Sequence, residues 1–230
     1  MIKIENVEVF GWEAAIRGMR NPMNSWDKSD TESNWKEVDI VFDEPYIDID
    51  FESGQIQQLG KNDLKLMKSL SKAGNDHGKF LRMINVTFDL TAPLYFFKEW
   101  DTYKVGTVAN SCSTMHKIHA KEFTVEDFSH EHVVDMGYTL LLNTIGTLND
   151  YRRWYLRDKD KEYWYQMIQL LPSSYNQKRT VQLNYQVLKS MYFARKNHKL
   201  DEWREFCKWC ETLPYFKEVC VDVWSEKVTE

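Results

Sequence analysis

The segment APLYFFKEWDTYKVGTVANSCSTMHK, residues 92–117, carries more information about the fold than any other part of the chain. An amphipathic stretch, in which Pro93 suits the first turn of a helix, ends in Glu99-Trp100. The cluster Thr102-Tyr103-Lys104 follows, and a run of small polar residues then closes on Cys112. This order predicts a helix that ends at about residue 101 and leads into a polar loop.

The hydrophobic pattern upstream of this segment predicts two strands and two helices. Residues 82–90 alternate apolar and polar side chains, which is typical of a half-buried strand. Its apolar face would consist of Ile84, Val86, Phe88 and Leu90. The pattern also predicts a strand over residues 2–9, a helix over Trp12–Met19, and a helix with Leu64, Met67 and Leu70 on one face that ends near Gly74.

The segment between those two helices, residues 20–63, is polar and rich in Asn, Asp and Ser. It contains Pro22, Pro45 and Gly54, which interrupt regular structure. We expect mostly exposed loops with one short extended piece at Val38–Phe42. The segment therefore has the character of an irregular insertion.

Helices dominate the sequence downstream. The mostly apolar Val133–Leu148 is expected to be a core helix, and helical character continues over Tyr151–Leu171 with a break near residues 157–162. A strand is expected over Gln177–Leu183, followed by helices over residues 184–195, over residues 201–212 and after Pro214. Strands early and in the middle of the chain, with helices behind them, favour an α+β fold. An antiparallel or mixed sheet would pack with a bundle of helices in one domain of residues 1–230.

The composition narrows the function classes. With 230 residues and 43% apolar residues, the chain can bury a large core. A net charge of −5 with mixed signs gives no global basic field for nucleic acid or an acidic membrane. No apolar run approaches the ~20 residues of a membrane span, and MIKIENVEVF has the pattern of a strand rather than a signal peptide. We expect a cytoplasmic protein whose four cysteines are thiols.

A second informative segment is MIQLLPSSYNQKRTVQLNYQVLKSMYFAR, residues 167–195. Together, the two segments resemble the signature blocks of flavin-dependent thymidylate synthases, in the same order. In that family a helix ending in Gln-Trp leads into Arg-His-Arg, and a Ser follows after seven residues. A later block has a Leu-Pro stop, a strand, and a helix that holds Asn and ends in Leu-Arg. Leu171-Pro172, Asn184, Leu188 and Arg195 fall in register with the later block, so the resemblance covers roughly residues 82–204.

The resemblance implies a function and an assembly. The family converts dUMP to dTMP with FAD, a reduced nicotinamide and methylenetetrahydrofolate, and it uses no cysteine nucleophile on the pyrimidine. Its members are homotetramers whose active sites are shared between subunits. By the same resemblance, the cofactor would contact Thr102, Tyr103, Lys104, Asn110, Asn184 and Gln186. The nucleotide substrate would contact Glu99, Ser111, Cys112, Ser113 and Arg195. No catalytic residue and no metal ligand is assigned.

Several of these positions depart from the family pattern. Thr102-Tyr103-Lys104 replaces Arg-His-Arg, and Cys112 replaces Ser. Glu99 replaces Gln, and Asn110 replaces Glu. Ile168 and Gln186 each replace an Arg. Each charged hydrogen bond lost from a phosphate contributes about 1.5–3 kcal/mol, so nucleotide binding would weaken unless other groups compensate. Arg152, Arg153 and the backbone N–H groups of Thr107–Thr114 are the candidates for compensation.

Two hypotheses follow. The first is an enzyme that transfers a one-carbon group to C5 of a pyrimidine deoxynucleotide such as dUMP. The alternative is a catalytically altered or inactive homologue that binds a nucleotide or a flavin, because a fold does not entail catalysis. Cys207 and Cys210 have the spacing of half a zinc site, but they lie within an expected helix and are interpreted as buried thiols.

Overall fold

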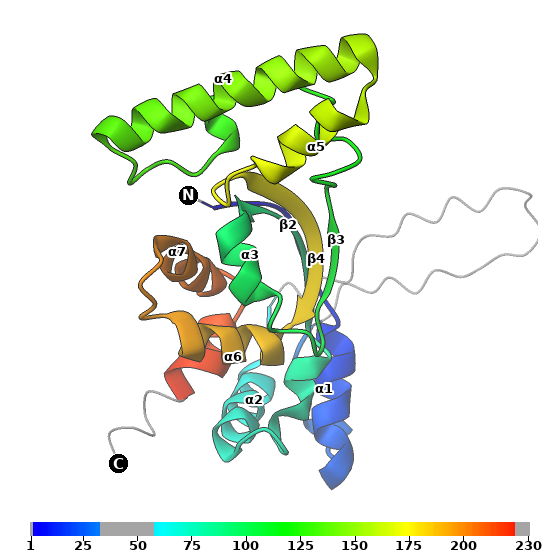
Figure 1. Cartoon of the computed structure of the whole chain (residues 1–230). Coiled ribbons are helices and arrows are strands. Elements are labelled where there is room, and N and C mark those ends of the chain that lie inside the picture. The colour runs from blue at the N-terminus through cyan, green and yellow to red at the C-terminus, as the bar shows by residue number, and fades with distance from the viewer. Residues whose placement is uncertain (1, 33–57, 224–230) are drawn as a thin grey trace, which may run out of the picture. The chain divides into compact units, whose positions relative to one another are not determined.

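The computed structural model describes residues 2–32 and 58–223 of the chain (Figure 1). The described residues fall into two compact units. The first unit comprises residues 2–6, 88–181 and 198–206. The second unit comprises residues 7–32, 58–87, 182–197 and 207–223.

A four-stranded antiparallel sheet is the frame of the fold, in the order β1-β2-β4-β3. The strands are β1 (Lys3–Phe10), β2 (Asn85–Pro93), β3 (Val108–Ser111) and β4 (Asn176–Asn184). The sheet and its helices confirm the predicted α+β class. β3 lies within the stretch expected to be a polar loop, and its four residues are all exposed.

Strand β2 shows why the alternating pattern was informative. Val86, Phe88 and Leu90 are fully buried, whereas Asp89 faces the polar side. The Asp89 carboxylate accepts hydrogen bonds from Asn6 Nδ2 at 2.8 Å and from Thr180 Oγ1 at 2.6 Å. The predicted start at residue 82 is wrong, because residues 78–82 form a 3₁₀ helix, η3 (Gly78–Arg82), before the strand begins.

An aromatic cluster forms the core of the first unit beside α3 (Leu94–Trp100) and the start of α7 (Asp201–Cys210). Phe96 packs on Trp203 with ring centroids 4.5 Å apart, and Trp100 stacks on Trp203 at 6.0 Å. Pro93 precedes the helix as its N-cap, since its fixed φ suits a helix start. The expected helix over residues 93–101 is thereby confirmed.

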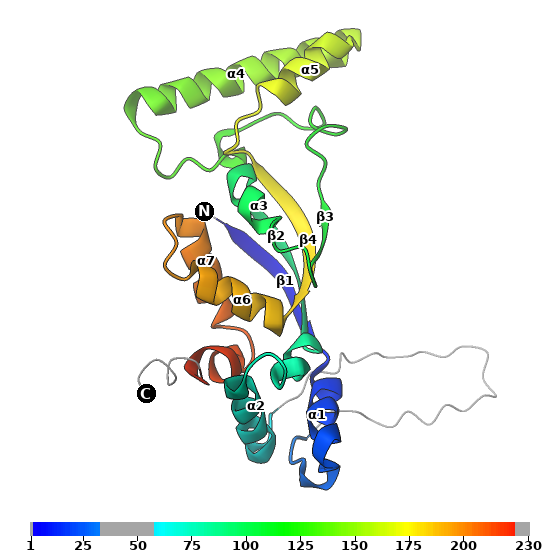
Figure 2. The same cartoon turned by 60° about the horizontal axis from the view of Figure 1, so that its bottom comes forward.

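Helices α4 (Asp135–Asp158) and α5 (Lys161–Gln169) also belong to the first unit and lie side by side (Figures 1 and 2). The break between them was expected, and Asp160 caps α5 by accepting from the Glu162 N–H. The expectation of a core helix is wrong, because α4 buries only one stripe, which includes Leu141, Ile145 and Leu148. No helix of the described chain is both long and apolar enough to span a bilayer.

The second unit gathers α1 (Trp12–Arg20), α2 (Lys61–Ala73), α6 (Tyr185–Arg195) and the π-helix η5 (Lys217–Asp222). Its core includes edge-on contacts of the Tyr185 ring with Trp12 and Phe216, at centroid distances of 5.5 and 5.3 Å. Gly11, which precedes α1, has φ +94°, and a Cβ there would lie 2.1 Å from the Met83 carbonyl oxygen. Only glycine therefore fits this turn.

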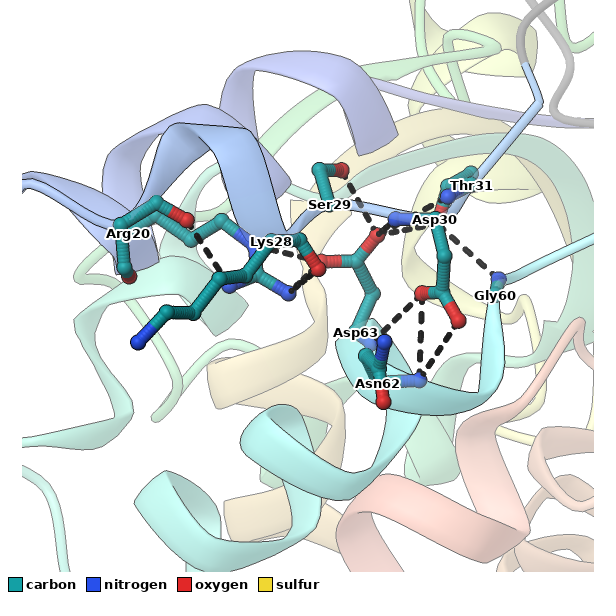
Figure 3. Close-up of polar contacts among 9 residues, drawn as sticks. Arg20, Lys28, Ser29, Asp30, Thr31, Gly60, Asn62 and Asp63 are labelled. Atoms are coloured by element: carbon teal, nitrogen blue, oxygen red, sulfur yellow. Dashed lines mark hydrogen bonds and ion pairs between the residues drawn. The ribbon is translucent and has the colours of Figure 1, made fainter.

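The two ends of the expected insertion meet in a buried ion pair, whereas most of its described residues are exposed, as the sequence predicts. Arg20 is 4% exposed and Asp63 is 0% exposed. Arg20 Nε donates to Asp63 Oδ1 at 2.7 Å, and Thr31 Oγ1 donates to Asp63 Oδ2 at 2.6 Å (Figure 3). Two 3₁₀ turns, η1 (Asn21–Met23) and η2 (Trp26–Lys28), lie between. The predicted extended piece at residues 38–42 lies outside the described residues.

Candidate functional site

A cavity of about 280 Å³ in the first unit is lined by two of the predicted substrate-binding residues, Cys112 and Ser113. We call it the Cys112 cavity. Its other lining residues come from the end of β2, the turn after β3, the segment around η4 (Val125–Asp127) and the start of β4. They are Thr91, Thr114, Lys121, Glu126, Asp127, Tyr175, Asn176, Gln177 and Lys178. The structure thus brings the expected polar turn into contact with a strand more than 60 residues later.

Hydrogen bonds to β4 fix the position of Cys112. Its N–H donates to the Lys178 carbonyl at 2.9 Å, and Gln177 Nε2 donates to the Cys112 carbonyl at 2.7 Å. Ser113 Oγ accepts from the backbone N–H groups of Met115 and His116 at 3.1 and 2.9 Å, which closes a tight turn. The exposed Cys112 thiol is therefore carried on a well-anchored backbone.

Both lysines that line the cavity are paired with carboxylates. Lys178 Nζ lies 2.9 Å from Asp89 Oδ2, and this hydrogen bond raises the pKa of Lys178. Lys121 pairs with Asp127. Burial, with a smaller contribution from the Asp127 carboxylate, raises the pKa of Tyr175 and keeps the phenol neutral. A bound phosphate would have to compete with both carboxylates for the two ammonium groups.

One buried polar atom of the cavity lining has no hydrogen-bond partner among the described residues. Asn176 Oδ1 is buried and accepts no hydrogen bond within the described chain. Its amide Nδ2 makes only a long 3.4 Å contact with the Glu126 carbonyl. A buried acceptor without a donor is costly, so this amide suits a ligand that presents an N–H or O–H group.

Glu99 and its neighbours surround Trp203 rather than the Cys112 cavity. Glu99 Oε2 accepts from Trp203 Nε1 at 2.9 Å and lies 3.3 Å from His198 Nε2. Thr102 Oγ1 donates to the Glu99 carbonyl at 2.7 Å, and the Tyr103 ring is 6.1 Å from that of Trp203. In this conformation the Glu99 carboxylate holds α7 against α3, which is a structural role that the sequence did not suggest.

Lys104, Asn110 and Ser111 are exposed. Lys104 follows α3 in the connection to β3, and the other two residues lie on β3 itself. The structure therefore leaves them accessible to a ligand, as the resemblance implies, and their contact with a cofactor or substrate stays a prediction.

The three remaining predicted residues belong to the second unit. Asn184 is the N-cap of α6, and its Oδ1 accepts from the Val187 N–H at 3.1 Å. Gln186 Nε2 donates to Asn75 Oδ1 at 3.3 Å, while its Oε1 is buried without a partner in the described part of the chain. Arg195 lies partly buried in the last turn of α6. This capping bond stabilises the start of α6, so it accounts for an asparagine at position 184 without a role in ligand binding.

The two arginines expected to compensate for lost phosphate contacts are engaged elsewhere in the first unit. Arg152 Nε donates to the His119 carbonyl at 3.0 Å, and Arg153 pairs with Asp150.

In the second unit, burial raises the pKa of the Cys207 thiol to about 12, and this thiol lies 3.8 Å from the Tyr192 carbonyl. This supports the interpretation of Cys207 as a buried thiol.

Sequence reasoning missed the contributions of β2 and β4 to the cavity. Asn176 and Lys178 lie two residues apart on β4, and Asp89 and Thr91 lie two residues apart on β2. This spacing puts each pair on one face of its strand. The polar half of the alternating pattern was therefore the available signal, whereas the predicted site residues rested on the family resemblance.

Comparison with solved structures identifies the fold of the chain. No family model matches the chain, and no curated protein matches it. Among solved structures, it is similar to the flavin-dependent thymidylate synthase ThyX from Helicobacter pylori complexed with FAD and dUMP. The TM-score is 0.66 at 14% identity, over 96% of this chain and 99% of that one. A second structure of the same enzyme with FAD and dUMP gives the same score and identity over 97% and 99%. The chain has the fold of a flavin-dependent thymidylate synthase.

Proposed function

We propose that this chain is a cytoplasmic flavin-dependent enzyme that transfers a one-carbon group to C5 of a pyrimidine deoxynucleotide such as dUMP. Its other reactants would be reduced nicotinamide and methylenetetrahydrofolate. The observation that carries the proposal is the similarity of fold, which extends over 96% of the chain to an enzyme crystallised with FAD and dUMP. The Cys112 cavity supports it, because the predicted substrate residues Cys112 and Ser113 line a cavity with an unsatisfied amide acceptor.

The chain offers groups suited to both ligands. The N3–H of a uracil ring is a donor of the kind that Asn176 Oδ1 lacks, and Lys178 and Lys121 could turn from their carboxylates toward a phosphate. The buried Gln186 Oε1 equally lacks a donor, and the flavin ring presents one. When bound, FAD would supply hydride transfer. The residues of the chain would bind, orient and shield the reactants.

Turnover by the purified protein tests this function. We expect dUMP to gain a methyl group, detected by mass spectrometry, in the presence of FAD, NADPH and methylenetetrahydrofolate. Arg195→Ala should reduce the rate by at least about ten-fold if it removes one charged contact to the nucleotide. Lys208→Ala, which changes an exposed lysine on α7, is the matched control. Equal rates in Arg195→Ala and wild type would contradict the role of Arg195.

The alternative of a binding protein rests on specific contacts. The Glu99 carboxylate is engaged by Trp203 and His198, and the two lysines of the Cys112 cavity are paired with carboxylates. Such a protein would hold a flavin or a nucleotide without turnover. Saturable binding of FAD or dUMP with no product, under conditions in which all reactants are present, would favour this alternative over the enzyme.

We further propose that the chain assembles into a homotetramer through α4. Met136 is 86% exposed and Leu140 is 67% exposed, and their spacing of four residues puts both on one face of this helix. An apolar face of this kind is typical of a subunit interface. Light scattering should give a tetramer for the wild type and smaller species for Leu140→Glu. Gln169→Glu, at an exposed position on α5, makes a similar change of charge as a control. A monomeric wild type would contradict the proposal.

A further inference from the structure

A side chain holds the segment that carries the Cys112 thiol. We call residues 112–114 the Cys112 turn. Strand β3 ends at Ser111, just before this turn, and the Cys112 carbonyl accepts from Gln177 Nε2 at 2.7 Å. Gln177 is only 8% exposed, so water has little access to this bond. The position of the turn therefore depends on the direction in which the Gln177 amide points.

Arg179 sets that direction. A side-chain amide has an acceptor at one end and two donors at the other. Arg179 Nε donates to Gln177 Oε1 at 3.0 Å, which leaves the Gln177 N–H₂ group for the Cys112 carbonyl. In the reverse orientation, donor would face donor at Arg179 and acceptor would face acceptor at Cys112. Both hydrogen bonds would be lost, so Arg179 selects the orientation that holds the turn.

The Arg179 guanidinium is itself fixed on two sides. Its Nη1 donates to Asp101 Oδ1 at 2.6 Å and its Nη2 to Asp101 Oδ2 at 3.4 Å. Its Cζ lies 3.8 Å from the centroid of the Phe97 ring, and the side chain is 12% exposed. A planar guanidinium can pair with a carboxylate and stack on a ring at the same time, whereas a lysine ammonium cannot reproduce this geometry. The chain of hydrogen bonds thus begins at a well-ordered group.

This chain of hydrogen bonds connects the two segments that the family resemblance singled out. Asp101 is the C-cap of α3 and directly precedes Thr102-Tyr103-Lys104, which are expected to contact the cofactor. At its other end lies Cys112, which is expected to contact the substrate and lines the Cys112 cavity. Arg179 is not among the residues that line this cavity, so it would act on a ligand only through Gln177.

We propose that Arg179 is a positioning residue that, through Gln177, holds the Cys112 turn in the conformation that a nucleotide substrate meets. The proposal rests on the proposed function, because that function makes the Cys112 turn part of the substrate site. It adds a residue that neither the family resemblance nor the cavity lining indicates.

Hydrogen exchange of the Cys112 amide, measured by NMR on the full chain, tests the effect on the turn without any ligand. This N–H donates to the Lys178 carbonyl, so its exchange rate reports how often the turn opens. Arg179→Lys should accelerate the exchange by about five-fold, because the amide of Gln177 loses its orienting donor. Gln177→Met should accelerate it at least as much. The double variant should exchange no faster than Gln177→Met, since Arg179 acts through Gln177.

Isothermal titration calorimetry with dUMP tests the effect on the substrate. We expect Arg179→Lys to raise the Kd for dUMP by about five-fold, because the ligand then has to order the turn. The melting temperature should stay within about 3 °C of the wild type, because lysine keeps a positive charge beside the half-exposed Asp101. A purely structural role of Arg179 would instead lower the melting temperature and leave Kd unchanged.

Arg157→Lys is the matched control. Arg157 pairs with Asp158 on α4, its side chain is 68% exposed, and the same substitution there should leave exchange and Kd unchanged. The proposal is overturned if Arg179→Lys shows the wild-type exchange rate or the wild-type Kd, or if the effects of the two substitutions add. Absence of dUMP binding to the wild type would refute the proposed function instead, and the exchange rates would still decide whether Arg179 controls the turn.

Discussion

Replacement of Asp63 by Asn should destabilise the second unit strongly. Asp63 Oδ1 accepts from Arg20 Nε and lies 2.7 Å from its terminal nitrogen, while Oδ2 accepts from Ser29 Oγ, Thr31 Oγ1 and the Thr31 N–H. All of these donors meet a fully buried carboxylate. The variant keeps the shape of the side chain but leaves the Arg20 charge buried without its counter-ion. Removal of one partner from a buried pair costs about 3–5 kcal/mol.

The assay is urea unfolding followed by circular dichroism. Asp63→Asn should lower the free energy of unfolding by about 3 kcal/mol or more. Asp76→Asn, at an exposed position just beyond α2, should change it by less than about 0.5 kcal/mol. If Asp63→Asn unfolds within about 1 kcal/mol of the wild type, the ion pair does not hold the two ends of the segment together.

The same contact predicts a pH dependence. Burial tends to raise the pKa of Asp63, but hydrogen bonds from Thr31, Ser29 and Arg20 together outweigh it, so the pKa is lowered. A group whose pKa is lower in the folded state stabilises fully above its unfolded pKa, about 3.9. This stabilisation is lost as the pH falls through the folded pKa. The difference in free energy of unfolding between wild type and Asp63→Asn should therefore shrink in acid. A difference that stays constant from pH 7 to pH 2 would refute this assignment.

Two further predictions concern the first unit and the thiols. Iodoacetamide should modify Cys112, which is exposed, and leave the buried Cys210 unmodified in the folded protein, as peptide mass mapping will show; equal labelling would contradict the burial of Cys210. Asn149→Ala should lower the free energy of unfolding, measured in urea, by about 2 kcal/mol. The buried Asn149 side chain forms 2.8 Å hydrogen bonds with both the N–H and the carbonyl of Phe123, and the variant loses both. An unchanged unfolding midpoint would show that these two backbone groups find other partners.

Local patterns in the sequence predicted those elements whose stability is decided locally. The alternation in β2 was sufficient because one face of that strand is fully buried. Asn184 before α6 and Gly74 after α2 mark helix ends by their own conformational preferences. In each case the relevant physical constraint lies within a few residues of sequence.

Other features depend on contacts between distant residues. Arg20 and Asp63 are 43 residues apart, and Glu99 and Trp203 are 104 residues apart, so no local pattern indicates that either pair meets. The prediction of a core helix at α4 was wrong for another reason. Its apolar residues are spread around the helix, which is typical of a buried helix, yet the described residues cover only one stripe of it.

The candidate site was predicted in part. The turn at Cys112 and Ser113 does line a cavity, although β3 is too short and too exposed to show a strand pattern. The carboxylates that pair with Lys121 and Lys178 were not anticipated, because these pairs join β2 to β4 and η4 to the loop before it. These carboxylates balance the charges of the Lys121 and Lys178 ammonium groups, so the cavity needs no anionic ligand to neutralise them.

Titration of the purified protein with FAD, followed by its visible spectrum, tests the central claim most directly. The proposed enzyme should bind FAD with a saturable change in flavin absorbance, and NADPH should bleach the bound flavin. A protein that stays colourless and takes up no FAD would contradict a flavin-dependent function, whatever the similarity of its fold.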